Sequence, residues 1–541
     1  MKQLILSFMA FVMAVAAQAQ TLNVTVGSVT YLFPASQTGD MTYQNGETLT
    51  IMGKTFTISD ISSMTVNSTS VTDAATGSQK GCLYIKGHAE FAQKGTLNIV
   101  GNVKHGIKTG EYVQIKNATI NVTSAVGDGI NCEQYFLMES GTINISGTGD
   151  DGIQCDIEDT DTGSTGETTD HEDEDSGNAY ISGGTITINC TATASKGVKC
   201  EGDMKISGGT INVSTSGKGE WDSDDLETKA AAGLSADGDI SISGGTIELT
   251  ATGSGRKGMK CDGTLTVTDG TITVVTSGGL YYNNGTTEYT NYTGNTDNID
   301  NSYYSAPKGI KAGLKTESGS SYTYSGGIAI SGGTITVTTS GTNGEGIESK
   351  NTFDITGGQI TVNSYDDALN AAQDITISGG QVYARSTNND GIDANGNCYI
   401  KGGLVFAIGA SSPEVAIDAN TEEQKKLYVQ GGTIVAIGGL ESGSQLTQSC
   451  YYTSSWSKST WYALTVGSNV FAFKTHSSGG SGLVVSGSST PTLKSGVTVS
   501  SGTSIFSGVG YADATVSGGS SVSLSSYSGN SGGPGGGGRP W

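Results

Sequence analysis

The chain has little of several residue types, and each shortage narrows what the protein can be. Six prolines stand against 83 glycines in 541 residues, which fits a turn-rich β protein better than a disordered one. The four histidines are scattered, so neither a zinc site nor a serine triad is visible. No region shows the 3.6-residue apolar period of an amphipathic helix. These absences point to an all-β protein.

Basic residues and long apolar runs are also scarce. Lysine and arginine total 28 against 51 acidic residues, and the formal charge of −23 argues against nucleic acid as a partner. The one apolar run is at the start: Lys2, a short apolar stretch and Ala17-Gln18-Ala19 predict a cleaved signal peptide over residues 1–19. That run is too short to span a bilayer, and no other segment is a candidate. We therefore expect a protein that is secreted or displayed at the cell surface.

A repeated phrase dominates what is present. Sequences close to Ser-Gly-Gly-Thr-Ile-Thr-Val recur about a dozen times, and uninterrupted copies are spaced 22, 23 or 25 residues apart. Three late copies depart from it and read Gly358-Gln359-Ile360, Gly380-Gln381-Val382 and Gly403-Leu404-Val405. A fixed period of this length, built from β-branched strands and glycine turns, is typical of a solenoid.

A second phrase, Gly-Ile-x-small, recurs in step with the first. Side chains alternate along a strand, so its apolar and small residues point inward and the residue between them points outward. The outward residues form a mid-phrase column: Lys108, Asn131, Gln154, Lys199, Ser235, Lys260, Lys311, Glu348, Asn370, Asp393 and Asp418. The residues just before the glycine form a pre-glycine column: His105, Asp128, Asp151, Lys196, Ala232, Lys257, Lys308, Glu345, Asp367, Asp390 and Val415. The fold expected is a right-handed parallel β-helix of about 12 coils.

The period also divides the chain into regions. After the signal peptide we expect an N-terminal β module at 20–68 that caps the first coil, the β-helix at 69–440, a Ser/Gly-rich C-terminal β region at 441–530 and a disordered Gly-rich tail at 531–541. Three insertions break the period, at 156–175, 214–231 and 277–306. The first is acidic and the last is rich in tyrosine. The tyrosines could stack on sugar rings or pack among themselves.

The eight cysteines raise the possibility of a disulfide framework. Four of them, Cys132, Cys155, Cys200 and Cys261, instead occupy the small inward position of the second phrase. This placement favours a buried stack of free cysteines that behave as small hydrophobes. Within the stack, we expect only Cys132 and Cys155 to be on neighbouring coils and able to oxidise.

Two acidic clusters are candidate metal sites. The first joins Asp128 with Asp150 and Asp151 one coil on. The second covers three successive coils: Glu345, Glu348, Asp366, Asp367, Asn370, Asp390 and Asp393. Carboxylate and amide oxygens without clustered cysteine or histidine suit Ca²⁺. The alternative is a solvated acidic face, and a bound ion could either fasten coils together or take part in ligand binding.

Lysines repeat in the middle coils of both columns. They form three pairs: Lys196 with Lys199, Lys257 with Lys260, and Lys308 with Lys311. Lysines at a regular spacing could bind the carboxylates of an acidic polysaccharide such as a polyuronate. They could equally pair with acidic neighbours in the same chain. The sequence leaves both alternatives open.

The repeats resemble a known family. Lys257-Gly-Met-Lys-Cys-Asp-Gly263 and Ile242-Ser-Gly-Gly-Thr-Ile247 are similar to phrases of exported β-helix proteins described as carbohydrate-binding domain proteins, and the resemblance covers about 80–440. It implies binding of cellulose or acidic plant polysaccharide such as pectin, and kinship with calcium-dependent pectate lyases. It also implies that calcium is held by aspartates of adjacent coils, which Asp128, Asp150 and Asp151 match, as do Asp366, Asp367 and Asp390.

The resemblance also raises the question of catalysis. In the related lyases a lysine beside the metal removes a proton from the uronate. Here the acidic residues and the lysines fall mostly on different coils. We therefore expect a binder of acidic polysaccharide without catalytic residues. A calcium-dependent lyase and a purely structural surface protein are the alternatives.

Overall fold

The computed structural model describes residues 21–27, 29–34, 42–44, 47–66, 69–73, 78–157, 174–294, 296, 299–319 and 321–529. The expected signal peptide, most of the acidic insertion and the Gly-rich tail lie outside these residues, and stay predictions. The chain forms two compact units, one of Met1–Lys205 with Gly209–Val213 and one of Ile206–Gly208 with Ser214–Trp541. Each is described by itself.

The first unit begins with a small β module. Strand β1 (Thr21–Val26) lies between β2 (Val29–Pro34) and β6 (Ile61–Val66) in an antiparallel sheet. Strands β3 (Thr42–Gln44), β4 (Thr48–Ile51) and β5 (Lys54–Thr57) form a second antiparallel sheet. Their apolar residues share a core around Leu22, Leu49 and Phe56. The module therefore has a core of its own, while its capping role stays a prediction.

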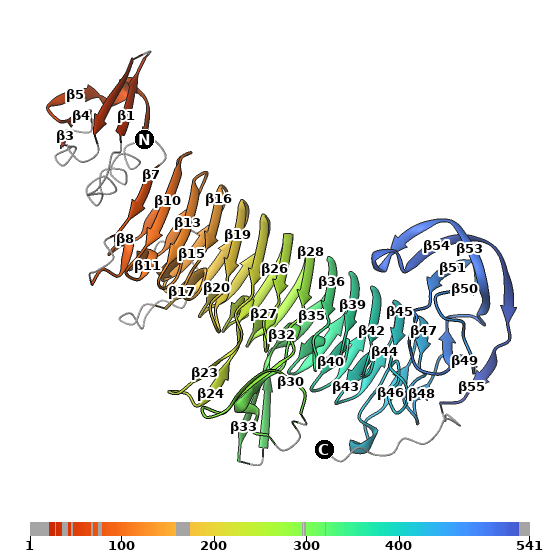
Figure 1. The fold of residues 1–541 in the computed structure, drawn as a ribbon. Coiled ribbons are helices and arrows are strands. Elements are labelled where there is room, and N and C mark those ends of the chain that lie inside the picture. Colours follow the sequence, from red (N-terminus) through yellow and green to blue (C-terminus); the bar gives the residue numbers. More distant parts are fainter. Residues whose placement is uncertain are drawn as a thin grey trace. The chain divides into compact units, whose positions relative to one another are not determined.

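Three series of short parallel strands build the coils of the first unit (Figure 1). The second phrase forms β8 (Gly81–Ile85), β11 (His105–Thr109), β14 (Ile130–Glu133), β17 (Ile153–Asp156) and β20 (Lys196–Cys200). The first phrase forms β10 (Thr96–Gly101), β13 (Thr119–Ala125), β16 (Thr142–Ser146), β19 (Thr185–Cys190) and β22 (Thr210–Thr215), stacked on β7 (Thr69–Thr72). The third series is β9 (Ala89–Phe91), β12 (Val113–Ile115), β15 (Tyr135–Met138), β18 (Asn178–Ile181) and β21 (Met204–Ile206).

Three series of the same kind build the coils of the second unit. The second phrase forms β25 (Ala232–Ala236), β27 (Lys257–Cys261), β32 (Lys308–Ala312), β37 (Glu345–Ser349), β40 (Leu369–Ala371) and β43 (Ile392–Ala394). The first phrase forms β36 (Thr334–Thr339), β39 (Gln359–Ser364), β42 (Gln381–Ser386), β45 (Leu404–Ile408) and β47 (Thr433–Ile437). The third series is β35 (Gly327–Ile330), β38 (Thr352–Ile355), β41 (Ile375–Ile377), β44 (Cys398–Ile400) and β46 (Leu427–Val429). Strands β26 (Ile240–Ala251) and β28 (Thr264–Thr276) are long strands that each belong to the third series and to the first-phrase series.

The register places equivalent repeat residues side by side. Ile107 pairs with Ile130, Ile130 with Ile153, and Ile153 with Val198, and all four side chains are fully buried. Burying such stacked aliphatic side chains contributes about 1.5–3 kcal/mol each. The chain is thus an all-β protein whose long parallel sheets stack in register, and the expected parallel β-helix is confirmed at this level.

Glycine is required in both phrases for different reasons. The second glycine of Ser-Gly-Gly-Thr has a left-handed backbone, as at Gly184 with φ +77°, which residues with a Cβ rarely adopt. The glycine of the second phrase is needed for close packing. A Cβ on Gly152 would lie 2.5 Å from the carbonyl oxygen of Gly197 on the next coil. The two phrases therefore mark the turns and positions of close contact between coils.

Two of the three predicted insertions, 214–231 and 277–306, form antiparallel strands in the second unit. Strands β23 (Glu220–Asp222) and β24 (Glu227–Lys229) pair, as do β29 (Leu280–Asn283), β30 (Glu288–Tyr292) and β31 (Tyr304–Ser305). The Trp221 and Tyr303 rings are 5.8 Å apart, and Thr228 Oγ1 donates a hydrogen bond to the carbonyl oxygen of Asn283. These contacts join the two insertions. Within the tyrosine-rich insertion, the Tyr282 ring packs against those of Tyr289 (5.9 Å) and Tyr292 (5.3 Å), which supports self-packing.

A fourth insertion went unrecognised in the sequence. Strands β33 (Leu314–Ser318) and β34 (Ser321–Ser325) form an exposed hairpin. Its alternating Thr and Tyr residues resemble a regular coil strand, so the change of period was hidden.

The C-terminal region packs on the outer face of the last coils. A closed barrel forms from β50 (Trp461–Val466), β51 (Asn469–Lys474), β54 (Gly510–Val522) and β53 (Thr492–Ile505). Its apolar residues share one core with Tyr383, Phe406 and Val435 of β42, β45 and β47. Strand β52 (Leu483–Ser486) pairs antiparallel with β47 and with β49 (Cys450–Thr453), which also pairs with β55 (Ser525–Tyr527), while β48 (Gln445–Leu446) pairs with β46. These strands end the parallel stack.

The cysteine stack is confirmed, with one correction. The structure contains free cysteines at all eight positions, and Cys132, Cys155, Cys200 and Cys261 are fully buried or nearly so. Cys155 is opposite Cys132 on one side and Cys200 on the other. The expectation that only Cys132 and Cys155 are neighbours was wrong, because the insertion at 156–175 lengthens the chain between β17 and β18 without adding a coil to the stack.

Candidate metal and ligand sites

In the first unit, the pre-glycine column forms a ladder of hydrogen bonds between coils. His105 Nδ1 accepts the backbone N–H of Asp128 (3.1 Å), Asp128 Oδ1 accepts that of Asp151 (3.0 Å), and Asp151 Oδ1 accepts that of Lys196 (2.6 Å). The ladder satisfies backbone donors where the chain bends into the second phrase, so these side chains fasten neighbouring coils together.

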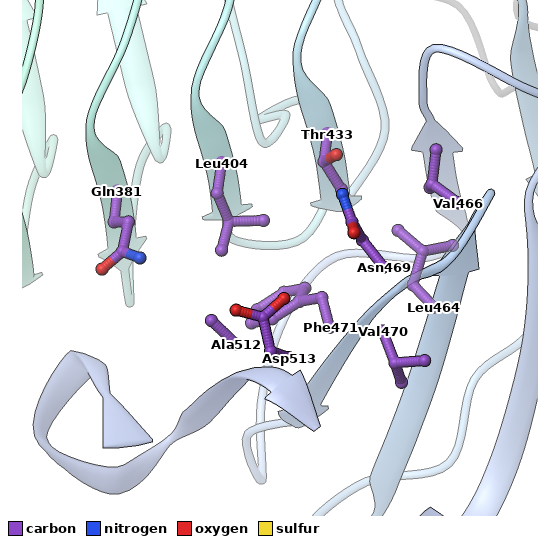
Figure 2. Close-up of a pocket in the computed structure, with 10 residues that line it drawn as sticks. All are labelled: Gln381, Leu404, Thr433, Leu464, Val466, Asn469, Val470, Phe471, Ala512 and Asp513. Carbon is purple, nitrogen blue, oxygen red and sulfur yellow. The ribbon is translucent and has the colours of Figure 1, made fainter. Parts of the chain in front are cut away.

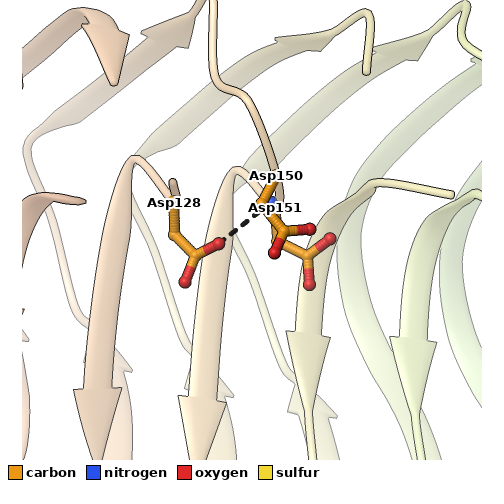
Figure 3. Close-up of side chains that lie close together, drawn as sticks. All are labelled: Asp128, Asp150 and Asp151. Atoms are coloured by element: carbon orange, nitrogen blue, oxygen red, sulfur yellow. Dashed lines mark hydrogen bonds between the residues drawn. The ribbon is translucent and has the colours of Figure 1, made fainter. Parts of the chain in front are cut away.

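The carboxylates of three aspartates in this region lie close together. Asp128, Asp150 and Asp151 can each offer an oxygen such that the three atoms lie within 4.8 Å of one another (Figure 3). Asp128 and Asp151 are buried, whereas Asp150 is exposed. We call this group the first aspartate triad. The structure thus brings together the three residues of the first predicted cluster.

The electrostatics of the first triad favour a cation. Burial raises the pKa of Asp151 to about 7, with a further contribution from the negative charges of Asp150 and Asp128, although nearby Lys196 opposes the shift. Lys196 is also at the next rung of the ladder. Burial and the negative charge of Asp128 raise the pKa of Asp150, and the positive charges of Lys196 and Lys199 oppose that shift. The triad therefore combines crowded carboxylates with two lysines on the adjacent coil.

In the second unit, the ladder recurs. Asp367 Oδ1 accepts the backbone N–H of Asp390 (2.9 Å), and Asp390 Oδ1 accepts that of Val415 (2.6 Å). Asn370 Nδ2 donates to Asp367 Oδ2 (3.2 Å) and to Asp393 Oδ2 (3.0 Å). Asn131 donates in the same way to Asp128 (2.7 Å) in the first unit, so an Asp-x-x-Asn element is built twice.

The carboxylates that meet in the second unit are those of Asp390, Asp393 and Asp418, again within 4.8 Å. We call them the second aspartate triad. Burial raises the pKa of Asp393 to about 7, and burial together with a hydrogen bond to Glu441 raises that of Asp418 to about 11. Asp418 lies one coil beyond the predicted cluster. Its signal was the last copy of the second phrase, Ala416-Ile417-Asp418.

The other residues of the second predicted cluster have different partners. Lys308 Nζ is 2.5 Å from Glu345 Oε1 and 3.3 Å from Glu348 Oε1, and Lys350 also pairs with Glu348. Asp366 Oδ1 accepts a hydrogen bond from Asn389 Nδ2. Burial next to Glu348 raises the pKa of Glu345 to about 7, whereas the lysines hold that of Glu348 well below its ordinary value despite burial. The two glutamates thus belong to a buried ion-pair network.

The predicted lysine pairs of the second unit are part of the protein interior or its own ion pairs. Lys257 is buried and donates to Ser305 Oγ and to the Gly255 carbonyl oxygen, and Lys260 Nζ is 3.3 Å from Asp262. Burial lowers the pKa of Lys257, and that of Lys311 to about 8. These contacts support the intramolecular alternative here, while ligand binding by any of the six lysines stays a prediction.

The mid-phrase column faces away from the core, yet several of its side chains are buried. Lys108, Asn131 and Glu348 are all less than a tenth exposed. Neighbouring side chains cover them: Lys108 Nζ donates to Asn131 Oδ1 (2.7 Å) and Glu133 Oε1 (2.6 Å). Pointing outward from the core therefore does not make these residues solvent-exposed.

Both triads fit a hard divalent cation. Their donors are carboxylate oxygens, the ligands that Ca²⁺ takes, and Ca²⁺ requires about six to eight of them. Three carboxylates supply between three and six oxygens, depending on whether they bind through one oxygen or two. Water or a ligand would complete the shell. The donor set excludes a soft-metal site, and it leaves room for an external oxygen ligand.

A comparison with models of protein families shows which family the chain belongs to. The model of the carbohydrate-binding domain-containing protein family matches residues 37–285 and 300–391, more than half of the chain. The chain belongs to this family. A search of the curated proteins found no match, and neither did a search of the solved structures.

The family region contains the first aspartate triad and Asp390 of the second. Asp393, Asp418 and the C-terminal barrel lie beyond it. In the part of the chain that the structure describes, no helix has both the length and the apolar character that crossing a bilayer requires.

Proposed function

We propose that this protein is exported and binds an acidic polysaccharide of the polygalacturonate type through Ca²⁺, without cleaving it. The observation that carries the proposal is the pair of oxygen-only aspartate triads in a member of a carbohydrate-binding family. A protein with a formal charge of −23 repels a polyanion. A cation shared between the protein and uronate carboxylates overcomes that repulsion.

The residues of the first triad have defined roles in this proposal. Asp128 and Asp151 remain hydrogen-bonded to the ladder through one oxygen each, which fixes their orientation. Exposed Asp150 is on the solvent side, where a glycan can approach. Ca²⁺, when bound, supplies positive charge that the surrounding carboxylates lack. Lys196 and Lys199 on the adjacent coil add charge of the sign that attracts a uronate.

The test is co-precipitation with insoluble polygalacturonate, with calcium or with a chelator. We expect calcium-dependent retention, and its loss in the Asp150→Asn variant, which leaves the ladder intact. Asp354→Asn is the matched control because Asp354 is an exposed aspartate outside both triads. Calcium-independent retention, or equal retention of the Asp150 variant, would contradict the proposal.

Two alternatives are decided by the same samples. The ladder favours a purely structural role for the protein, because the triad aspartates already fasten coils together. In that case calcium would stabilise the fold, but polygalacturonate would not retain the protein. The proximity of Lys196 and Lys199 to the first triad favours a lyase. Rising ultraviolet absorbance from unsaturated uronides would establish cleavage, and flat absorbance would favour the binder.

A further inference from the structure

The three late repeat copies that depart from Gly-Thr-Ile occupy one place in the fold. Gln359, Gln381 and Leu404 stand where other copies have threonine, and they pair in register from β39 to β42 to β45, followed by Thr433 on β47. The C-terminal barrel covers this part of the helix. The departures from the repeat therefore coincide with the surface on which the barrel packs.

The barrel does not fill this surface completely. A cavity of about 190 Å³ remains between Gln381, Leu404 and Thr433 on one side and Asn469, Phe471 and Asp513 on the other (Figure 2). Leu404, Phe471 and four further apolar residues line it, and Gln381, Thr433, Asn469 and Asp513 add two amides, a hydroxyl and a carboxylate. Cavities that hold drug-sized molecules are usually about 300–1,000 Å³, so this one suits a single small ring.

Hydrogen bonds hold one polar group at the rim, the amide of Gln381, in place. Gln359 Nε2 donates to Gln381 Oε1 (3.4 Å), and Gln359 Oε1 accepts the backbone N–H of Phe506 (3.2 Å). This chain of contacts orients the Gln381 amide, whose nitrogen is on the Leu404 side in Figure 2. Asp513 has a left-handed backbone (φ +50°), and its carboxylate extends over the cavity.

We propose that this cavity binds one neutral hexopyranose ring. An apolar lining suits the C–H face of a sugar, and amide and carboxylate groups at the rim suit its hydroxyls. The Asp513 carboxylate repels a uronate, so the preference here is opposite to that of the aspartate triads. The inference rests on the proposed function only in that both require a glycan partner, because no cation is needed at this site. Of the ten residues that line the cavity, all except Gln381 lie beyond the family match.

The test uses saturation-transfer difference NMR of the full chain with methyl β-D-glucopyranoside, methyl α-D-galactopyranoside and galacturonic acid. We expect signals from at least one neutral glycoside, unchanged by chelator, and none from galacturonic acid. Signals confined to galacturonic acid, or requiring calcium, or absent from both glycosides would overturn the inference.

Substitutions of the lining residues test whether the glycoside binds in this cavity. Leu404→Trp fills the cavity and should abolish the signals, and Asp513→Asn should weaken affinity about tenfold because a charged hydrogen-bond acceptor is lost. Gln381→Ala is a second rim variant in case the tryptophan disturbs folding, which circular dichroism reports. Asp354→Asn should bind as the wild type does. Undiminished signals in folded cavity variants would refute the site.

The calcium-dependent binding of polygalacturonate and the glycoside site in the cavity can each be refuted without refuting the other. The cavity variants should retain calcium-dependent co-precipitation with polygalacturonate, and the Asp150→Asn variant should retain glycoside binding. Loss of polygalacturonate retention in wild-type protein that still binds a glycoside overturns the proposed function alone. The reverse result overturns the cavity alone.

Discussion

Replacing Asp151 with asparagine should have opposite effects with and without calcium. Asparagine keeps the shape of the side chain and an oxygen that can accept the backbone N–H of Lys196. It removes a buried negative charge crowded by Asp150 and Asp128. Without metal the change should therefore stabilise the first unit. With calcium it should remove most of the stabilisation that the ion gives, since one of three charged ligands is lost.

The pKa of Asp151 sets the size and the pH window of the effect. It rises from 3.8 to about 7 in the folded protein. At about 1.4 kcal/mol for each pKa unit, ionising this group above pH 7 costs the metal-free folded state about 4 kcal/mol. The unfolded chain ionises first, so stability falls as pH rises from about 4 to about 7 and is then constant. Below pH 4 Asp151 is protonated in both states, and the substitution should have little effect.

The assay is hydrogen exchange with mass spectrometry on peptides covering residues 126–156, because a long solenoid does not unfold in one step. At pH 8 with chelator, protection in the variant should rise by up to about 1,000-fold, the equivalent of 4 kcal/mol. Glu47→Gln, an exposed acidic residue of the same unit, is the control. Faster exchange in the metal-free variant, or equal stabilisation of variant and wild type by calcium, would refute the reasoning.

Three further predictions follow from the packing. Lys308→Met leaves Glu345 without its lysine and should lower the hydrogen-exchange protection of peptides from residues 305–350 by the equivalent of about 3–5 kcal/mol. Adding Glu345→Gln should restore part of that protection, and unchanged protection in the single variant would contradict the buried network. Gly152→Ala should lower the unfolding temperature strongly, whereas Gly95→Ala, whose Cβ meets nothing within 4 Å, should not. Equal effects of the two substitutions would show that neighbouring coils can shift apart to accept a Cβ at Gly152. Native protein should react slowly with Ellman's reagent, but eight thiols should react after denaturation under inert gas, and fewer would reveal disulfides.

The repeating phrases made the coil architecture predictable. Each copy carries its own strand alternation and turn glycine, so strand and turn are decided by residues close in sequence, as Gly184 shows. Once one repeat equals one coil, the register follows, and Asp128 falls beside Asp151. The first aspartate triad could be found from the sequence for this reason.

It was less predictable which acidic residues come together as a candidate metal site where lysines and acidic residues occupy the same columns. Glu345 and Glu348 fall in the same columns as the aspartates, yet Lys308 and Lys350 pair with them. The reach of a lysine side chain spans neighbouring coils, so a column position alone does not tell which partner it takes. The second triad consequently forms from Asp390, Asp393 and Asp418.

By itself the sequence determined an all-β repeat fold, its columns and a buried cysteine stack, because each depends on periodicity and local geometry. Only the tertiary structure decided which chain segments become neighbours across an interruption. It placed Cys200 beside Cys155 despite the insertion between them, and it laid a barrel over Tyr383 and Phe406 to leave a cavity beside Gln381. Such contacts join residues that no repeat relates, and their packing depends on the three-dimensional path of the whole chain.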